Sequence, residues 1–89
     1  MQEVKVQEDA VTAVLRLVAE GFRPFVVGDP AAPDCLVYVR AAAGLRDMVK
    51  VHGPEAAEAV RMVGTGMTRR AEGATAEVVA AVLGWSICE

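Results

Sequence analysis

The sequence has few of the residue types on which most catalytic, redox and nucleic-acid sites depend. Its 89 residues include a single His, two Cys and only 4% aromatic residues, and the 12 acidic residues outnumber the 9 basic ones. Two cysteines, Cys35 and Cys88, are too few for a disulfide scaffold. A net charge of −3 offers no basic footprint of the kind that binds phosphate backbones. Nucleic acid is therefore a disfavoured partner.

Recognisable site motifs and targeting segments are also missing. The chain has no P-loop, no Rossmann glycine fingerprint, no Cys-x-x-Cys and no His-x-x-x-His. The charged N-terminal stretch lacks the apolar core of a signal peptide, and no apolar run has the length of a membrane span. We expect a cytoplasmic protein without membrane contact, cofactor or metal. Enzymatic activity is not excluded, but the residues favour a non-catalytic role.

Apolar residues are abundant, at 54% of the chain, and most of them are Val, Ala and Leu. A chain of 89 residues fits one domain, 1–89, whose surface is large for its volume. Such a small domain cannot bury all of its apolar residues, so an apolar patch should stay exposed. A homo-oligomer or a protein partner is the simplest explanation for that patch.

Hydrophobic periodicity and turn residues divide the chain into elements. Residues 1–7 are either a short edge strand or a disordered lead-in. Val11, Val14, Leu15 and Val18 recur at helical spacing within residues 8–20, and Gly21 is placed to end that helix. Strands are predicted at 23–27, 35–40 and 67–71, and helices at 54–63 and 76–83, the last capped by Thr75. Residues 41–52 fit a helix or a strand, and we favour a strand at 47–52.

The predicted fold is α/β in the broad sense, more closely α+β. It consists of a small three-stranded, mainly antiparallel sheet packed with three helices, in the order α-β-β-β-α-(β)-α. The predicted core residues are Val14, Leu15, Val18, Val26, Val37, Val39 and Val60. The residues predicted to form an interface are Phe25, Val27, Leu36 and Tyr38 on the first strand pair, and Trp85 after the last helix.

Three groups of polar residues are candidates for binding. The lone His52 lacks a Cys or Ser partner at a telling spacing, so a strand-end position is the better interpretation. Glu55 and Glu58 lie one helical turn apart if their segment is a helix, where a solvated face is more common than a cation site. Arg69 and Arg70 form the only adjacent basic pair, which could bind a phosphate but is more often a surface pair. Residues 75–86 resemble the first half of a helix-turn-helix, without a recognition helix.

The opening helix, the strand after Gly21, Asp34 ahead of a second strand and Lys50 on a third resemble the layout of the PD-(D/E)XK nucleases, over roughly residues 8–83. The resemblance implies that Asp34 is a magnesium ligand and that Lys50 helps to orient the attacking water. Met48 stands where the family has its second acid, and a thioether does not ligate magnesium. Asp47 is adjacent to it but should point to the other face of the strand. The resemblance therefore implies a degenerate, catalytically inactive domain.

The same element order is similar to the double-stranded-RNA-binding-like fold of HicA-type toxins. That family places a catalytic His in the strand region where this chain has Cys-Leu-Val-Tyr at 35–38. The resemblance is one of topology alone.

These observations rank three functions. The first is a small non-catalytic interaction or dimerisation module with an accessory or regulatory role. The second is a degenerate or metal-dependent nuclease-like domain that uses Asp34 and Lys50. The third is a nucleic-acid-binding accessory protein that uses Arg69 and Arg70.

Overall fold

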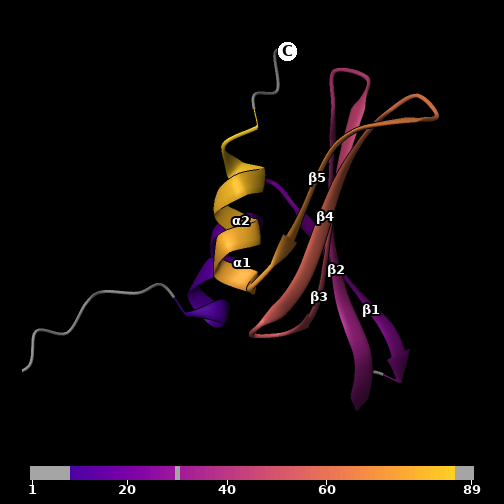
Figure 1. Cartoon of the computed structure of the whole chain (residues 1–89). Helices are drawn as coiled ribbons and strands as arrows, with labels where there is room; N and C mark the ends of the chain where they lie inside the picture. The colour runs from indigo at the N-terminus through magenta and orange to yellow at the C-terminus, as the bar shows by residue number, and fades with distance from the viewer. Residues whose placement is uncertain (1–8, 30, 86–89) are drawn as a thin grey trace, which may run out of the picture.

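The computed structural model describes residues 9–29 and 31–85, and within them the chain forms a five-stranded antiparallel sheet and two helices. The elements, in chain order, are α1 (Ala10–Ala19), β1 (Arg23–Asp29), β2 (Ala32–Ala42), β3 (Leu45–Gly53), β4 (Ala56–Val63), β5 (Gly66–Gly73) and α2 (Thr75–Leu83). Each strand pairs with its neighbour in sequence, so the sheet is a simple meander (Figure 1). The element expected at residues 1–7 and Cys88 both lie outside the described residues.

The broad prediction of an α+β fold is confirmed, but its details are wrong. The sheet has five strands instead of three, and the described residues contain two helices instead of three. Both helices lie on the same side of the sheet, with the long β1–β2 hairpin extending beyond them (Figure 1). The expected strands at 23–27, 35–40, 47–52 and 67–71 all fall inside observed strands.

The largest error concerns residues 54–63, where the sequence predicts a helix and the structure has β4. Pro54 and Glu55 form a two-residue connection between Gly53 and Ala56, which are paired across the β3–β4 hairpin. From there the burial alternates with a period of two, because Ala57, Ala59 and Arg61 are buried and the residues between them are more exposed. Pairing with β3 on one side and β5 on the other overrides the helix propensity of an alanine-rich segment.

Within the ambiguous segment 41–52, the favoured strand at 47–52 lies in β3, and residues 41 and 42 end β2. Ala43 and Gly44 connect β2 to β3, and both have positive φ angles, of 52° and 82°. This is the backbone that a tight two-residue hairpin turn requires, since its twist matches that of the strands. Ala43 is the only non-glycine residue with a positive φ in the described part of the chain.

Helix α1 buries a different apolar stripe from the one predicted, although Val14 of the predicted core is half-buried and packs against the core. Ala13 and Leu17 are fully buried, whereas Leu15 is 62% exposed and Val18 is 46% exposed. The helix carries two stripes at helical spacing, one through Ala13 and Leu17 and one through Leu15 and Val18. Periodicity alone cannot choose between two such stripes. The smaller residue Ala13 allows the helix to approach the core closely, and the exposed stripe faces away from it.

Helix α2 supplies much of the core from three valines, Val78, Val79 and Val82, each at most 1% exposed. Thr75 is the first residue of the helix and not its cap, because Ala74 occupies the cap position. The Thr75 hydroxyl donates a 2.7 Å hydrogen bond to the Gly53 carbonyl instead. This bond fixes the start of α2 to the end of β3.

The two faces of the sheet differ in what covers them. We call the helix-bearing side the covered face, and Tyr38, Val49 and Ala59 point into the core there. The side formed by the alternate residues is the open face, and neither described helix packs on it. Val37 belongs to the open face and is buried among its strand neighbours, outside the main core cluster. Val39 and Val60, also predicted as core, are half-buried on the open face.

Candidate functional site

The most exposed apolar segment of the sheet lies on its edge strand β1. Phe25, Val26 and Val27 are consecutive residues with exposed fractions of 54%, 49% and 44%. We call these three residues the β1 edge. β1 pairs only with β2, so its other side presents unpaired backbone groups within the described sheet. Val26, which the sequence predicts to be buried, is therefore a surface residue.

The β1 edge is continuous with the apolar part of the open face. Phe25 lies opposite Val37, and Val37 in turn lies opposite Lys50 on β3. In the next row of the sheet, Val39 lies opposite Met48, which lies opposite Val60. All three residues of that row are half-buried. An apolar band therefore runs from β1 across β4, with charged residues on either side of it.

The predicted interface residues do not share one surface. Phe25 and Val27 lie on the open face, but Leu36 and Tyr38 are on the covered face of β2. Tyr38 is only 6% exposed, and burial raises the pKa of its hydroxyl. Alternation within each strand does not show which face of β1 lies beside which face of β2, and the register places Phe25 beside Val37 and not beside Leu36.

Trp85 is half-buried against the core, so it offers little surface to a partner. Its backbone N–H donates a 3.0 Å hydrogen bond to the Val82 carbonyl, which continues the helical turn at the end of α2.

A buried charged cluster holds the covered face together at the middle of the sheet. Asp47 on β3 lies between Arg40 on β2 and Arg61 on β4, each directly opposite it in the sheet register. The Arg61 Nε donates to Asp47 Oδ1 at 2.7 Å, and the Arg61 Nη2 donates to Oδ2 at 2.9 Å. The Arg40 Nη2 donates to the same Oδ2 at 2.9 Å. Asp47 and Arg61 are fully buried.

Aromatic rings complete this cluster. The Arg40 guanidinium lies 4.6 Å from the centre of the Phe22 ring, and that of Arg61 lies 5.7 Å from the centre of the Trp85 ring. The Trp85 carbonyl also accepts a 3.4 Å hydrogen bond from Arg61 Nη2. The cluster thus connects the three central strands to the segments that follow α1 and α2.

Electrostatics keep the Asp47 carboxylate charged. Burial acts to raise its pKa, but the hydrogen bonds and charges of Arg61 and Arg40 outweigh burial, so its pKa lies below the ordinary value. The Arg40 Nε is buried without a hydrogen-bond partner among the described residues. Because every carboxylate oxygen of Asp47 already accepts from an arginine, this cluster is a structural ion-pair network with no open ligand position.

The two residues of the nuclease resemblance are not in contact. Asp34 is exposed on β2, where its carboxylate oxygen lies 2.8 Å from the place that a Cβ on Gly28 would occupy. Lys50 is exposed on the open face of β3, opposite Val37 and Glu58. Asp47 points to the covered face, as its position beside Met48 implies. Among the described residues, no three acidic, His or Cys side chains gather in a way that could hold a metal ion.

Arg69 and Arg70 do not form one basic patch. They are neighbours on β5, so their side chains leave opposite faces of the strand. Arg70 forms a 2.8 Å ion pair with Glu72, and Arg69 lies opposite Arg61 in the sheet register. Both arginines are exposed.

His52 is placed near the end of β3, as expected, and its Nε2 lies 3.4 Å from a carboxylate oxygen of Glu58. Glu55 and Glu58 do not lie on a helix face, because Glu55 is in the β3–β4 connection and Glu58 is in β4. The expected one-turn spacing of the two carboxylates is therefore wrong.

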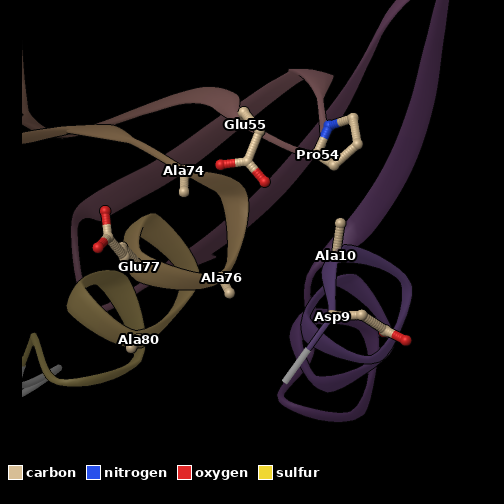
Figure 2. A pocket seen from close by; sticks show the side chains of 8 residues that line it. All are labelled: Asp9, Ala10, Pro54, Glu55, Ala74, Ala76, Glu77 and Ala80. Atoms are coloured by element: carbon tan, nitrogen blue, oxygen red, sulfur yellow. The ribbon is translucent and has the colours of Figure 1, made fainter. Parts of the chain in front are cut away.

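A hollow of about 590 Å³ lies between the starts of the two helices and the β3–β4 connection. Figure 2 shows alanines along its walls, with the Glu55 and Glu77 side chains at one side and Asp9 pointing away. Asp9 caps α1 by accepting a 2.8 Å hydrogen bond from the Thr12 N–H, and this backbone hydrogen bond lowers its pKa. The hollow thus combines small apolar side chains with carboxylates, and none of its lining residues is a His, Lys, Cys, Ser or Thr.

No protein-family model, no curated protein and no solved structure matches the chain. α1 and α2 have 10 and 9 residues, and no helix in the described part of the chain is long and apolar enough to cross a membrane. The fold and its surfaces define a small α+β domain with one helix-covered and one open sheet face.

Sequence reasoning missed Val26 and the cluster around Asp47. Three consecutive apolar residues beside a Pro on an outer strand were the available signal for an exposed edge. The ion-pair cluster had no such signal, because Asp47 and Arg61 are 14 residues apart and meet only once the register of β3 and β4 is known.

Proposed function

We propose that this protein is a non-catalytic interaction module that associates through the β1 edge and the adjoining apolar band of the open face. The observation that carries the proposal is the run of three exposed apolar residues, Phe25, Val26 and Val27, on an edge strand. Exposing such a run costs free energy in water, and a partner that covers it recovers that free energy.

The charged groups support a binding role over a catalytic one. The strongest cluster, Arg40, Asp47 and Arg61, is internally satisfied at the carboxylate and buried under the helices. The exposed Arg70 and Glu72 form an ion pair with each other, and His52 Nε2 lies 3.4 Å from a carboxylate oxygen of Glu58. No contact among the described residues favours the nuclease-like or nucleic-acid-binding alternatives, which stay predictions from the sequence.

Sedimentation velocity tests the proposal on the full chain at concentrations from low to high micromolar. We expect a dimer or larger species whose fraction grows with concentration. Phe25→Glu should weaken association without changing the far-UV circular dichroism, since Phe25 is 54% exposed. Val11→Glu is the control, because Val11 is 66% exposed on α1, outside the proposed surface. A wild-type chain that stays monomeric at high micromolar concentration would contradict the proposal.

A further inference from the structure

We propose that the partner at the β1 edge is a second copy of this chain, bound by antiparallel pairing of β1 with β1 about a two-fold axis at Val26. The two five-stranded sheets would join into one continuous ten-stranded sheet. The inference rests on the proposed function, since it names the occupant of that same surface.

The two edges of the sheet differ in how well they are protected against pairing. Natural edge strands are guarded by charged side chains, prolines and bulges, and β5 has three charged side chains, Arg69, Arg70 and Glu72. β1 has Pro24 before its centre and a bulge after Val27, but its centre carries no charge, because Phe25, Val26 and Val27 fill it. One edge with an uncharged apolar centre in each copy gives a closed two-fold dimer, whereas two such edges would allow an open fibre.

The β1 sequence, Arg-Pro-Phe-Val-Val-Gly-Asp, complements itself when it is reversed about Val26. In that register Val26 faces Val26 of the second copy, and Phe25 faces Val27 of the second copy. Aromatic and β-branched residues directly opposite each other are favourable cross-strand pairs. The apolar bands of the two open faces then meet across the new pairing.

Charge complementarity occurs at both ends of the same register. Arg23 falls opposite Asp29 of the second copy, and the two-fold axis repeats the pair at the other end. Within the described residues Arg23 makes no ion pair. Asp29 accepts one 2.9 Å hydrogen bond, from the Ala31 N–H to its Oδ1. Gly28 has a φ of +94°, which bends the strand before Asp29, and the long Arg23 side chain can span that bend.

The backbone of β1 is compatible with this pairing. Pro24 lacks an N–H, so it costs least where its nitrogen faces away from β2. Alternation along the strand then turns the N–H and C=O of Val26 to the same outer side. Val26 and its symmetry mate would exchange two hydrogen bonds, whereas Pro24, on the same outer side and opposite Gly28 of the second copy, has no N–H to donate there. The irregularity in the β1–β2 register begins only after Val27, so this central region is regular.

The first test is Val26→Lys beside Val11→Lys, each measured by sedimentation equilibrium of the full chain. Because Val26 faces itself, a single substitution places two positive charges opposite each other. We expect the dimer dissociation constant to rise at least about tenfold for Val26→Lys, because like charges opposite each other in an interface are costly, and to stay within about twofold for Val11→Lys. A wild-type dimer that survives Val26→Lys unchanged but is weakened by Phe25→Glu would overturn the β1 pairing while leaving association through the open face in place, and a dimer that survives both would overturn both proposals. If Val11→Lys weakens the dimer and Val26→Lys does not, the interface lies on α1. That result would also contradict the β1 pairing.

The second test uses charge exchange between Arg23→Asp and Asp29→Arg. Each variant alone places like charges opposite each other at both ends of the pairing, so each should dimerise more weakly than the wild type. An equimolar mixture restores both ion pairs, and native mass spectrometry should show the heterodimer above the statistical half. The double variant should recover the wild-type dissociation constant. A statistical mixture of species would exclude this register.

Discussion

Asp47 and Arg61 face each other across β3 and β4, both fully buried, and are joined by two hydrogen bonds of 2.7 and 2.9 Å. This relationship decides which substitutions the fold tolerates. A buried charge is stable only with its partner, and removing one member of such a pair is costly even where the pair itself adds little net stability.

We predict that Asp47→Asn lowers the free energy of unfolding by about 3–5 kcal/mol, because it leaves the buried Arg61 and Arg40 without a counter-charge. Urea denaturation followed by circular dichroism measures the change. Glu72→Gln is the matched control, since it breaks the exposed Arg70–Glu72 pair and should cost less than about 1 kcal/mol. Equal effects of the two substitutions would show that the cluster is not the structural element described.

The stability of the protein should fall in acid through Asp47. Its pKa in the folded chain lies below the ordinary value of 3.8, because the arginine hydrogen bonds outweigh burial. The folded state therefore binds the proton less tightly than the unfolded state. The stabilisation is fully present above the unfolded pKa and is lost as the pH falls through the folded pKa. Urea midpoints from pH 7 to 2 should fall more steeply for the wild type than for Asp47→Asn. Parallel curves would mean that other carboxyl groups dominate.

Two leucines of α1 should behave in opposite ways. Leu17 is fully buried, so Leu17→Ala should cost about 2–5 kcal/mol through lost burial and a cavity. Leu15 is 62% exposed, so Leu15→Ala should change the free energy of unfolding by less than about 0.5 kcal/mol in the monomer. Thermal and urea unfolding of both variants checks which stripe is packed. A large loss of unfolding free energy for Leu15→Ala would show that the stripe through Leu15, and not the stripe through Leu17, is packed against the core.

We predict that no magnesium- or manganese-dependent cleavage of plasmid DNA or RNA occurs. Asp34 is exposed beside Gly28, and the described residues provide no second acid near it that could hold the same cation. The assay compares the wild type with Asp34→Ala. Metal-dependent cleavage by the wild type that disappears in Asp34→Ala would establish the nuclease-like alternative.

Much of the sheet could be predicted from the sequence, because β1, β2, β3 and β5 each combine alternation or β-branched residues with clear turns. β4 could not. Its alanines and Glu58 favour a helix locally, and only the neighbouring strands impose the strand. The same non-local information decides which face of β2 receives Tyr38 and where Asp47 finds Arg61. The proposed interface and the ion-pair cluster both depend on this information. The sequence patterns therefore predict which residues are in strands, but not which face of the sheet each residue occupies or which residue lies opposite it.

The bond between the Thr75 hydroxyl and the Gly53 carbonyl also bears on how the chain is made. Each β hairpin joins neighbours in sequence, so the meander can assemble strand by strand as it leaves the ribosome. α2 is synthesised after the whole sheet, and its three buried valines seal the covered face only then. Until α2 packs, the sheet therefore presents its covered face as well as its open face to water. A chain in which α2 has not yet docked is the form most exposed to aggregation.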